Sequence, residues 1–246
     1  MSELFSIQLQ NRQQQGRDGV WLDLPTTTEQ VQAALRQIGI SSDNPQGLFI
    51  SGYFAEVEKR FAIPYNMVLA SNVDELNFLA ARLETLSAGE RAELNAALQA
   101  PQSELFSIGR ITDFPENVDY YVHLPDVHGP AQLGDYYLNR SGMVDMPEEW
   151  KGGIDTAQFG RYVAQQEQGV FTEYGYLVKS GDAWQKVHEG QPVPEEYRVL
   201  SFPAPEVLRD AANIPPPVQP ETEPQKVIPI ILNGKDSAER MKEITD

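Results

Sequence analysis

The first fifty-odd residues alternate between strand-like and helix-like patterns of apolar side chains. Residues 3–10 place apolar side chains at alternate positions, and the apolar run 20–24 is short, so both segments predict strands. From Thr26 onward apolar residues recur at helical spacing, and Thr26 with Glu29 has the spacing of a capping box. Residues 48–54 again favour a strand. The predicted order of elements is therefore β-β-α-β.

The middle of the chain predicts two consecutive helices. Residues 73–83 repeat apolar side chains at helical spacing, and Ser87 with Glu90 has the spacing of a second capping box. Apolar residues then continue at that spacing as far as Leu98. Because both helices are short, we expect them to form a small helical spacer.

A six-residue stretch occurs twice in the chain. Ser-Glu-Leu-Phe-Ser-Ile stands at 2–7 and again at 103–108. Two weaker echoes follow at similar spacing, 21–25 with 121–125 and 47–49 with 169–171, and the second interval has room for helices near 133–139 and 156–166. We infer a duplicated β-β-α-β unit with an enlarged second copy, because self-similarity is a strong sign of repeated architecture. Chance likeness between strand-rich segments is the alternative.

These patterns predict an α+β fold in which two related β-β-α-β-type domains flank a small helical domain, followed by a proline-rich C-terminal tail. The predicted ranges are 1–66 for the N-terminal α+β domain, 67–101 for the helical spacer, 102–200 for an acidic C-terminal α+β domain and 201–246 for the tail. The proline-rich part is expected to be an extended linker. A helix signal that starts near Ser237 and stops at Asp246 suggests the beginning of a further module.

Charge changes the picture. The chain has 36 acidic and 19 basic residues and a net charge of -17, so it should repel nucleic acid and anionic membranes and be attracted to basic surfaces. A charge that serves only solubility is the alternative interpretation. Cysteine is absent, which excludes disulfides and thiolate chemistry. No signal peptide or bilayer-spanning run is found, and a soluble, cytoplasmic protein is expected.

The sequence offers few candidates for catalytic or metal-binding residues. His123, Asp126 and His128 lie close together and are residue types that bind zinc, but Pro125 and Gly129 indicate a loop around them. The chain has no phosphate-binding loop, dinucleotide fingerprint or nucleophile elbow. We therefore expect no enzymatic activity, no cofactor and no metal. A metal-dependent enzyme that uses these three residues is kept as a competing hypothesis.

Several motifs together resemble the ArdA family of antirestriction proteins. They are Trp-Leu-Asp-Leu-Pro at 21–25 before a capped helix, Asn-Phe-Leu-Ala at 77–80 with Leu83, Leu-Gly-Asp-Tyr-Tyr-Leu at 133–138, Ile-Asp at 154–155 with Phe-Gly-Arg at 159–161, and Phe-Thr-Glu-Tyr-Gly-Tyr at 171–176. Each motif alone is modest, but their order and spacing are more specific. The resemblance covers approximately residues 1–180, and the proline-rich tail lies outside it.

The resemblance implies an elongated, three-domain protein that forms a homodimer and is carried on mobile genetic elements such as conjugative plasmids and transposons. It implies inhibition of type I restriction–modification enzymes by imitation of bent B-form DNA. The partner would then be the DNA-binding groove of the enzyme's methyltransferase core, without direct binding of nucleic acid or membrane. An acidic adaptor that binds a basic partner without DNA mimicry is the competing hypothesis.

If the chain imitates DNA, its carboxylates must take the place of phosphates. Acidic residues between 111 and 200 are interrupted by few bases, although any one of them can equally be a solvated surface carboxylate or a helix cap. The predicted phosphate mimics are Asp113, Glu116, Asp119, Asp126, Asp135, Asp145, Glu148, Glu149, Asp155, Glu167 and Glu173. Tyrosine is favoured at interfaces but also fills cores, so the candidates for the dimer contact are Tyr136, Tyr137, Tyr162, Tyr174 and Tyr176.

Overall fold

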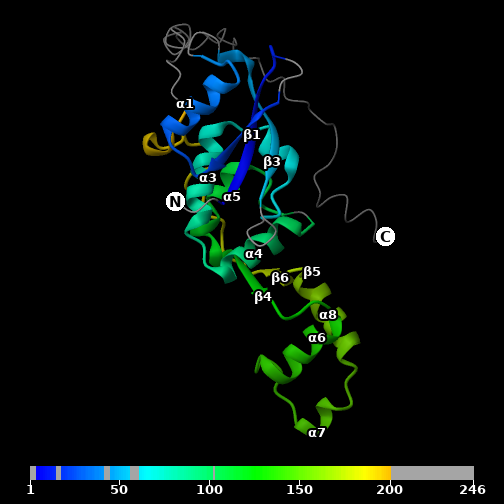
Figure 1. The fold of residues 1–246 in the computed structure, drawn as a ribbon. Coiled ribbons are helices and arrows are strands. Elements are labelled where there is room, and N and C mark those ends of the chain that lie inside the picture. The colour runs from blue at the N-terminus through cyan, green and yellow to red at the C-terminus, as the bar shows by residue number, and fades with distance from the viewer. Residues whose placement is uncertain (1–3, 15–17, 42–44, 56–60, 102, 201–246) are drawn as a thin grey trace, which may run out of the picture. The chain divides into compact units, whose positions relative to one another are not determined.

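The computed structural model describes residues 4–14, 18–41, 45–55, 61–101 and 103–200 (Figure 1). The chain divides into two units, Met1–Pro203 and Ala204–Asp246. The predicted linker, the C-terminal helix signal and the whole range 201–246 lie outside the described residues. Within the described part, no helix combines the length and the apolar character that crossing a membrane requires.

The N-terminal part contains a three-stranded antiparallel sheet. The strands are β1 (Phe5–Asn11), β2 (Val20–Leu24) and β3 (Leu48–Phe54), in the spatial order β2-β1-β3. Alternate residues of β1 are buried, as expected for a sheet with one face on a core. Helix α1 (Thr28–Gln37) packs against β2. The β-β-α-β order predicted for this segment is confirmed.

Helix α1 begins one residue later than the predicted capping box implied. The Thr27 side chain accepts the Gln30 N–H at 3.4 Å, and the Gln30 side chain accepts the Thr27 N–H at 3.1 Å. Thr26 is buried, and its N–H donates to Asn77 Oδ1 at 2.7 Å. The Thr26–Glu29 box was therefore wrong by one position, because a tertiary contact fixes Thr26 outside the helix.

Three helices follow the first sheet: α2 (Tyr65–Leu69), α3 (Val73–Glu84) and α4 (Ala88–Gln99). The two predicted helices and the Ser87–Glu90 capping box are confirmed. The same hydrophobic core contains Ile7 of β1, Leu35 of α1, Leu79 of α3 and Ile111 farther along the chain. The helices thus share a core with the first sheet, and the predicted domain ranges remain a prediction.

The second copy of the repeated hexapeptide does not form a strand. Leu105 is buried in the core, and Ser107 caps helix α5 (Ile108–Thr112), where its side chain accepts the Arg110 N–H at 3.2 Å. Two short 3-10 turns, Phe114–Glu116 and Val118–Tyr120, then lead to β4 (Tyr121–Leu124). A strand at 103–108, which the duplication required, was therefore a wrong prediction.

The remaining elements build a second sheet with helices beside it. They are α6 (Pro130–Asp135), a π-helical turn (Tyr136–Arg140), α7 (Glu148–Lys151), α8 (Thr156–Glu167), β5 (Val170–Thr172), β6 (Gly175–Lys179) and a last 3-10 turn (Glu195–Tyr197). The helices predicted near 133–139 and 156–166 are confirmed. The spatial order is β4-β6-β5, so the last strand is central, whereas the first strand is central in the N-terminal sheet. The two sheets do not share one topology.

Helices α6 and α8 cross in close contact. A Cβ on Gly134 would lie 1.9 Å from the Thr156 carbonyl oxygen, and a Cβ on Gly160 would lie 1.8 Å from the Pro130 carbonyl oxygen. Only glycine fits such an approach of two backbones. The crossing, next to a small second core that includes Tyr176, positions the part of the chain that carries most of the predicted phosphate mimics.

Candidate partner-binding surface

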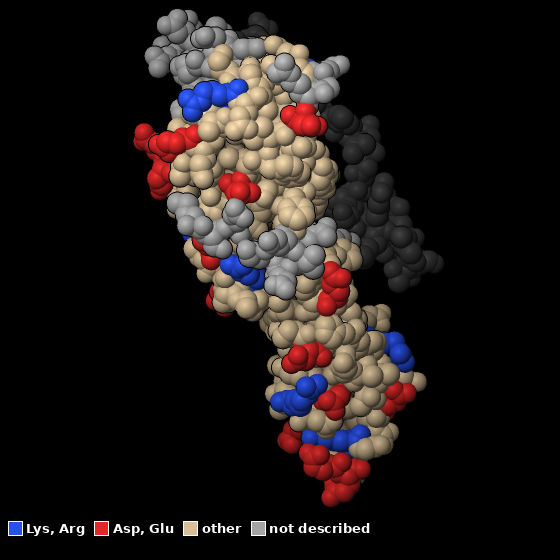
Figure 2. Space-filling view, viewed as in Figure 1, with Lys and Arg blue, Asp and Glu red and all other residues tan. Residues whose placement is uncertain are grey.

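Seven of the predicted phosphate mimics are exposed. They are Asp119, Asp126, Asp145, Glu148, Glu149, Asp155 and Glu173, and they are called the exposed acids below. Figure 2 shows acidic side chains gathered at the end of the molecule that carries α7, with scattered acids and bases elsewhere on the same face. Exposure is what a phosphate mimic requires, since only a solvent-facing carboxylate can enter a partner's groove.

Three of the exposed acids lie in the first turn of α7 or at the start of α8. Glu148 and Glu149 follow Pro147 in the first turn of α7, where negative charge is favoured. The Glu148 side chain is 81% exposed and pairs with Lys151 at 2.6 Å. Asp155 is the N-cap of α8, so for this residue the alternative role as a helix cap is also realised. An exposed ion pair holds its partners weakly, which leaves Glu148 available to another cation.

Asp113 is not on the surface, and its assignment as a phosphate mimic is corrected. The residue is 0% exposed. Its carboxylate accepts the backbone N–H groups of Val187 at 3.3 Å, His188 at 2.6 Å and Glu189 at 3.2 Å. These bonds compensate the cost of burying the charge. Asp113 therefore holds a loop instead of facing a partner.

Glu116 and Asp135 are half-buried and already paired. Glu116 forms an ion pair with Arg82 of α3. Asp135 pairs with Arg140 at 3.2 Å and accepts a hydrogen bond from the Asn139 side chain at 2.8 Å. A partner would have to compete with these internal contacts, so both acids fit the predicted role less well than the exposed acids.

Glu167 receives two tyrosine hydroxyls. The Tyr176 hydroxyl donates to Glu167 at 2.9 Å, and the Tyr137 hydroxyl donates to its other carboxylate oxygen. Burial, followed by the hydrogen bond to Glu167, raises the pKa of each tyrosine above its ordinary value of 10. The hydrogen bonds of Glu167 thus connect α8 to β6 and to the π-helical turn.

The tyrosine candidates for a dimer contact also differ in their solvent exposure. Tyr176 is 0% exposed and belongs to the second core, so it is not free for an interface. Tyr162 is 60% exposed. Sequence reasoning did not single out Trp150 and Met143, which are 69% and 76% exposed. Exposed large apolar side chains of this kind are available for contact with another protein.

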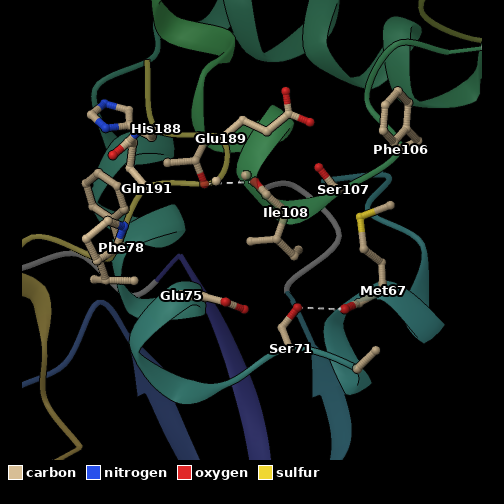
Figure 3. Close-up of a pocket in the computed structure, with 16 residues that line it drawn as sticks. Met67, Ser71, Glu75, Phe78, Phe106, Ser107, Ile108, His188, Glu189 and Gln191 are labelled. Atoms are coloured by element: carbon tan, nitrogen blue, oxygen red, sulfur yellow. Dashed lines mark hydrogen bonds between the residues drawn. The ribbon is translucent and has the colours of Figure 1, made fainter. Parts of the chain in front are cut away.

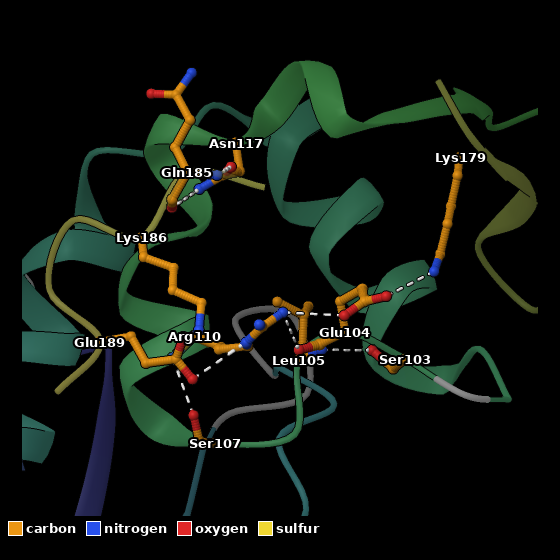
Figure 4. Close-up of polar contacts among 10 residues, drawn as sticks. All are labelled: Ser103, Glu104, Leu105, Ser107, Arg110, Asn117, Lys179, Gln185, Lys186 and Glu189. Atoms are coloured by element: carbon orange, nitrogen blue, oxygen red, sulfur yellow. Dashed lines mark hydrogen bonds and ion pairs between the residues drawn. The ribbon is translucent and has the colours of Figure 1, made fainter. Parts of the chain in front are cut away.

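Three bases in this half of the chain pair with acids outside the predicted set. Arg110 pairs with Glu104 at 3.0 Å and with Glu189 at 3.2 Å, and Lys179 pairs with Glu104 at 2.7 Å (Figure 4). The hydrogen bond from Lys179 lowers the pKa of Glu104 below its ordinary value. Lys186 also pairs with Glu189, at 3.3 Å. These bases are therefore not directed at the exposed acids.

The histidine loop shows no metal site. The His123 Nε2 atom lies 2.7 Å from the Tyr174 carbonyl oxygen, where it can donate a hydrogen bond. Across the described ranges, no cluster of three or more histidine and carboxylate side chains is arranged to hold a metal ion. The zinc hypothesis therefore finds no support from the positions of His123, Asp126 and His128.

Comparison with known proteins identifies one family. A family model described as antirestriction protein (ArdA) matches residues 15–178. All the predicted phosphate mimics fall inside the matched range. A comparison with curated proteins found no match to the chain.

Proposed function

The chain belongs to the ArdA antirestriction protein family, and on that premise we propose that it inhibits type I restriction–modification enzymes by imitating DNA. The observation that carries the proposal is the set of exposed acids within the matched range, in a chain with a net charge of -17. The proposed target is the DNA-binding groove of the enzyme's methyltransferase core, in the cytoplasm. The protein itself performs no catalysis.

The physical basis is competition for a basic groove. B-form DNA carries one negative charge per roughly 1.7 Å of helix axis, and proteins that bind it neutralise those charges with lysine and arginine. Carboxylates held on a folded surface attract the same side chains. Because ions are released from both surfaces, binding of the inhibitor weakens as salt concentration rises.

We propose that the exposed acids contribute most of this attraction. Asp113 and Glu167 serve the fold, and Glu116 and Asp135 are paired internally. The exposed acids are selected from the predicted phosphate mimics by their solvent exposure, and one of them, Glu148, is also in an exposed ion pair with Lys151.

We also propose that the protein acts as a homodimer. Tyr162, Trp150 and Met143 offer exposed apolar surface in the half of the chain that contains α7 and α8. Size-exclusion chromatography with light scattering would give twice the chain mass, and Tyr162→Asp would shift the mass toward one chain. A monomer at micromolar concentration would rule out this part of the proposal without affecting the inhibitory role.

The decisive experiment is titration of a purified type I enzyme with wild-type protein and two charge variants. The first variant changes the exposed acids to their amides, and Asp155→Asn keeps the cap of α8 because asparagine also caps helices. The control changes the same number of tail acids to amides: Glu206, Asp210, Glu221, Glu223, Asp236, Glu239 and Glu243. Both variants lose equal charge.

We expect the first variant to inhibit DNA cleavage at least about tenfold less strongly than wild type. The control variant should inhibit about as strongly as wild type. Wild-type inhibition should weaken as the salt concentration rises from about 50 to about 200 mM, the range over which contacts to DNA phosphates lose most of their affinity. Full inhibition by the first variant would reject DNA mimicry. Binding to basic proteins with no effect on the restriction enzyme would favour the acidic adaptor instead.

A further inference from the structure

A hollow of about 670 Å³ opens between helices α2, α3 and α5 and the segment 188–193 (Figure 3). Its volume lies within the roughly 300–1,000 Å³ that small-ligand sites occupy. None of the predicted phosphate mimics lines it. The hollow therefore calls for an explanation separate from the exposed acids.

Apolar and aromatic side chains form most of its wall. Phe78 of α3 is buried, with the His188 ring 5.0 Å from its own in an edge-to-face arrangement and the Tyr197 ring at 4.7 Å. Ile108 is also buried, whereas Phe106 is 63% exposed. The wall thus combines buried aromatic surface with one ring, Phe106, that is largely exposed to solvent.

One carboxylate in the hollow lacks a cationic partner. Glu75 is at the third position of α3, and its side chain accepts the Asn72 N–H at 3.4 Å. Within the described ranges, no lysine or arginine lies at ion-pair distance from Glu75. In Figure 3 its carboxylate extends toward the open space between Ile108 and Ser71. A negative charge beside apolar walls attracts a cation more strongly than one in open solvent.

The second acid that lines the hollow, Glu189, differs from Glu75 because it has cationic partners. Glu189 is paired with Arg110 and Lys186, so its charge is already compensated. Phe106 meanwhile has the Arg110 guanidinium 4.6 Å from its ring centroid. This contact places a guanidinium of the protein itself over an aromatic ring at the edge of the hollow.

We propose that the hollow binds an arginine side chain of a partner protein. The guanidinium would pair with Glu75 and stack on an aromatic ring, and the aliphatic stem would cover Ile108 and Met67. Anionic groups are disfavoured by Glu75. The proposal goes beyond DNA mimicry, because it requires neither a restriction enzyme nor a row of carboxylates.

The test measures binding of capped arginine, N-acetyl-arginine amide, to the isotope-labelled full chain by NMR. The matched ligand control is the citrulline analogue, which has nearly the same shape without the charge. We expect capped arginine to shift the amide signals of Ile108 and Gly109, and the citrulline analogue to bind at least about fivefold more weakly. Equal binding of both ligands, or shifts located elsewhere, would overturn the proposal.

Two variants locate the charge that is responsible. Glu75→Gln removes the negative charge but preserves the capping box, since glutamine serves equally at that position. Glu90→Gln is the matched control, because Glu90 holds the same capping position in α4 outside the hollow. We expect Glu75→Gln to weaken binding at least about fivefold and Glu90→Gln to leave it unchanged. Unchanged affinity for Glu75→Gln would refute the assignment.

Two further measurements separate guanidinium recognition from simple attraction of cations. Phe106→Ala changes an exposed side chain, so the fold is retained, and it should weaken capped arginine more than capped lysine. Wild-type protein that binds capped lysine as tightly as capped arginine would overturn the choice of arginine. Because no restriction enzyme is present, failure here leaves the proposed function standing, and failure of inhibition leaves this binding result standing.

Discussion

The amide oxygen of buried Asn77 accepts the backbone N–H of Thr26 at 2.7 Å, across 51 positions of the sequence. The amide nitrogen of the same side chain donates to the Tyr197 carbonyl oxygen at 3.0 Å. One side chain of α3 thereby joins the entry to α1 and the last turn of the described chain. Neither partner is adjacent in sequence, so the contact depends on the complete tertiary fold.

Asn77→Ala should destabilise the protein by about 3 kcal/mol, because a buried donor and a buried acceptor each lose their partner. Urea unfolding followed by circular dichroism would measure the loss. Asn139→Ala is the control, since Asn139 is exposed and its side chain bonds only to Asp135 at 2.8 Å in the described part. Equal effects of the two variants would show that the contact of Asn77 with Thr26 contributes little.

Gly160→Ala should disrupt the crossing of α6 and α8, because the added methyl group would lie 1.8 Å from the Pro130 carbonyl oxygen. Backbone must move to relieve that overlap, and a loss of more than about 2 kcal/mol is expected. Gly89→Ala is the matched control in α4, where nothing lies within 4 Å of the new methyl group. It should be neutral or stabilising by up to about 1 kcal/mol. Thermal unfolding of both variants would distinguish the two outcomes.

Glu93 should make stability depend on pH. Burial, with repulsion from Glu90 and Asp119, raises the pKa of Glu93 to about 8 from an ordinary value of 4.5. The folded protein therefore holds a proton that the unfolded chain has released between these values, and stability falls as pH rises through that interval. Relative to wild type, Glu93→Gln should gain stability from pH 5 to pH 8 and then level off.

Unfolding by urea at several pH values would test this expectation. Glu149→Gln is the control, because Glu149 is exposed on α7. A stability difference between Glu93→Gln and wild type that is the same at pH 5 and pH 8 would contradict a raised pKa for Glu93.

Glu167→Ala should separate structural acids from surface acids. The Tyr137 and Tyr176 hydroxyls would both lose their acceptor, with an expected loss of about 2 kcal/mol in unfolding free energy. At a temperature where the variant is folded, its inhibition of a restriction enzyme should remain close to wild type. Glu149→Ala should do the reverse, with unchanged stability and weaker inhibition. If folded Glu167→Ala inhibited the restriction enzyme much more weakly than wild type, Glu167 would have to be counted among the residues that bind the partner.

Much of the N-terminal fold was predictable because local signals and tertiary structure agree there. The alternation in β1, the helical spacing in α3 and the capping box of α4 each predicted the correct element. The repeated hexapeptide was misleading. After Ile7 the chain continues to alternate, whereas Ile108 is followed by Ile111 at helical spacing and Ser107 is placed to cap a helix. Six residues do not determine an element when their continuation favours another period.

The candidate surface was predictable only in part. Sequence shows where carboxylates are, but Asp113 and Asp119, six positions apart, are buried and exposed respectively. Asp113 stands between Ile111 and Phe114, and this apolar setting is the one signal that pointed inward. The backbone groups that donate to it lie 74 to 76 positions later in the chain, and no local pattern identifies them.

The buried carboxylate of Asp113 also has a consequence for the hollow beside α5. By holding the N–H groups of Val187, His188 and Glu189, it fixes one wall before any ligand arrives. A preorganised wall spares the ligand the conformational entropy cost of ordering that segment on association. The affinity of the hollow for the proposed arginine ligand therefore depends in part on Asp113, a side chain that the ligand would not touch.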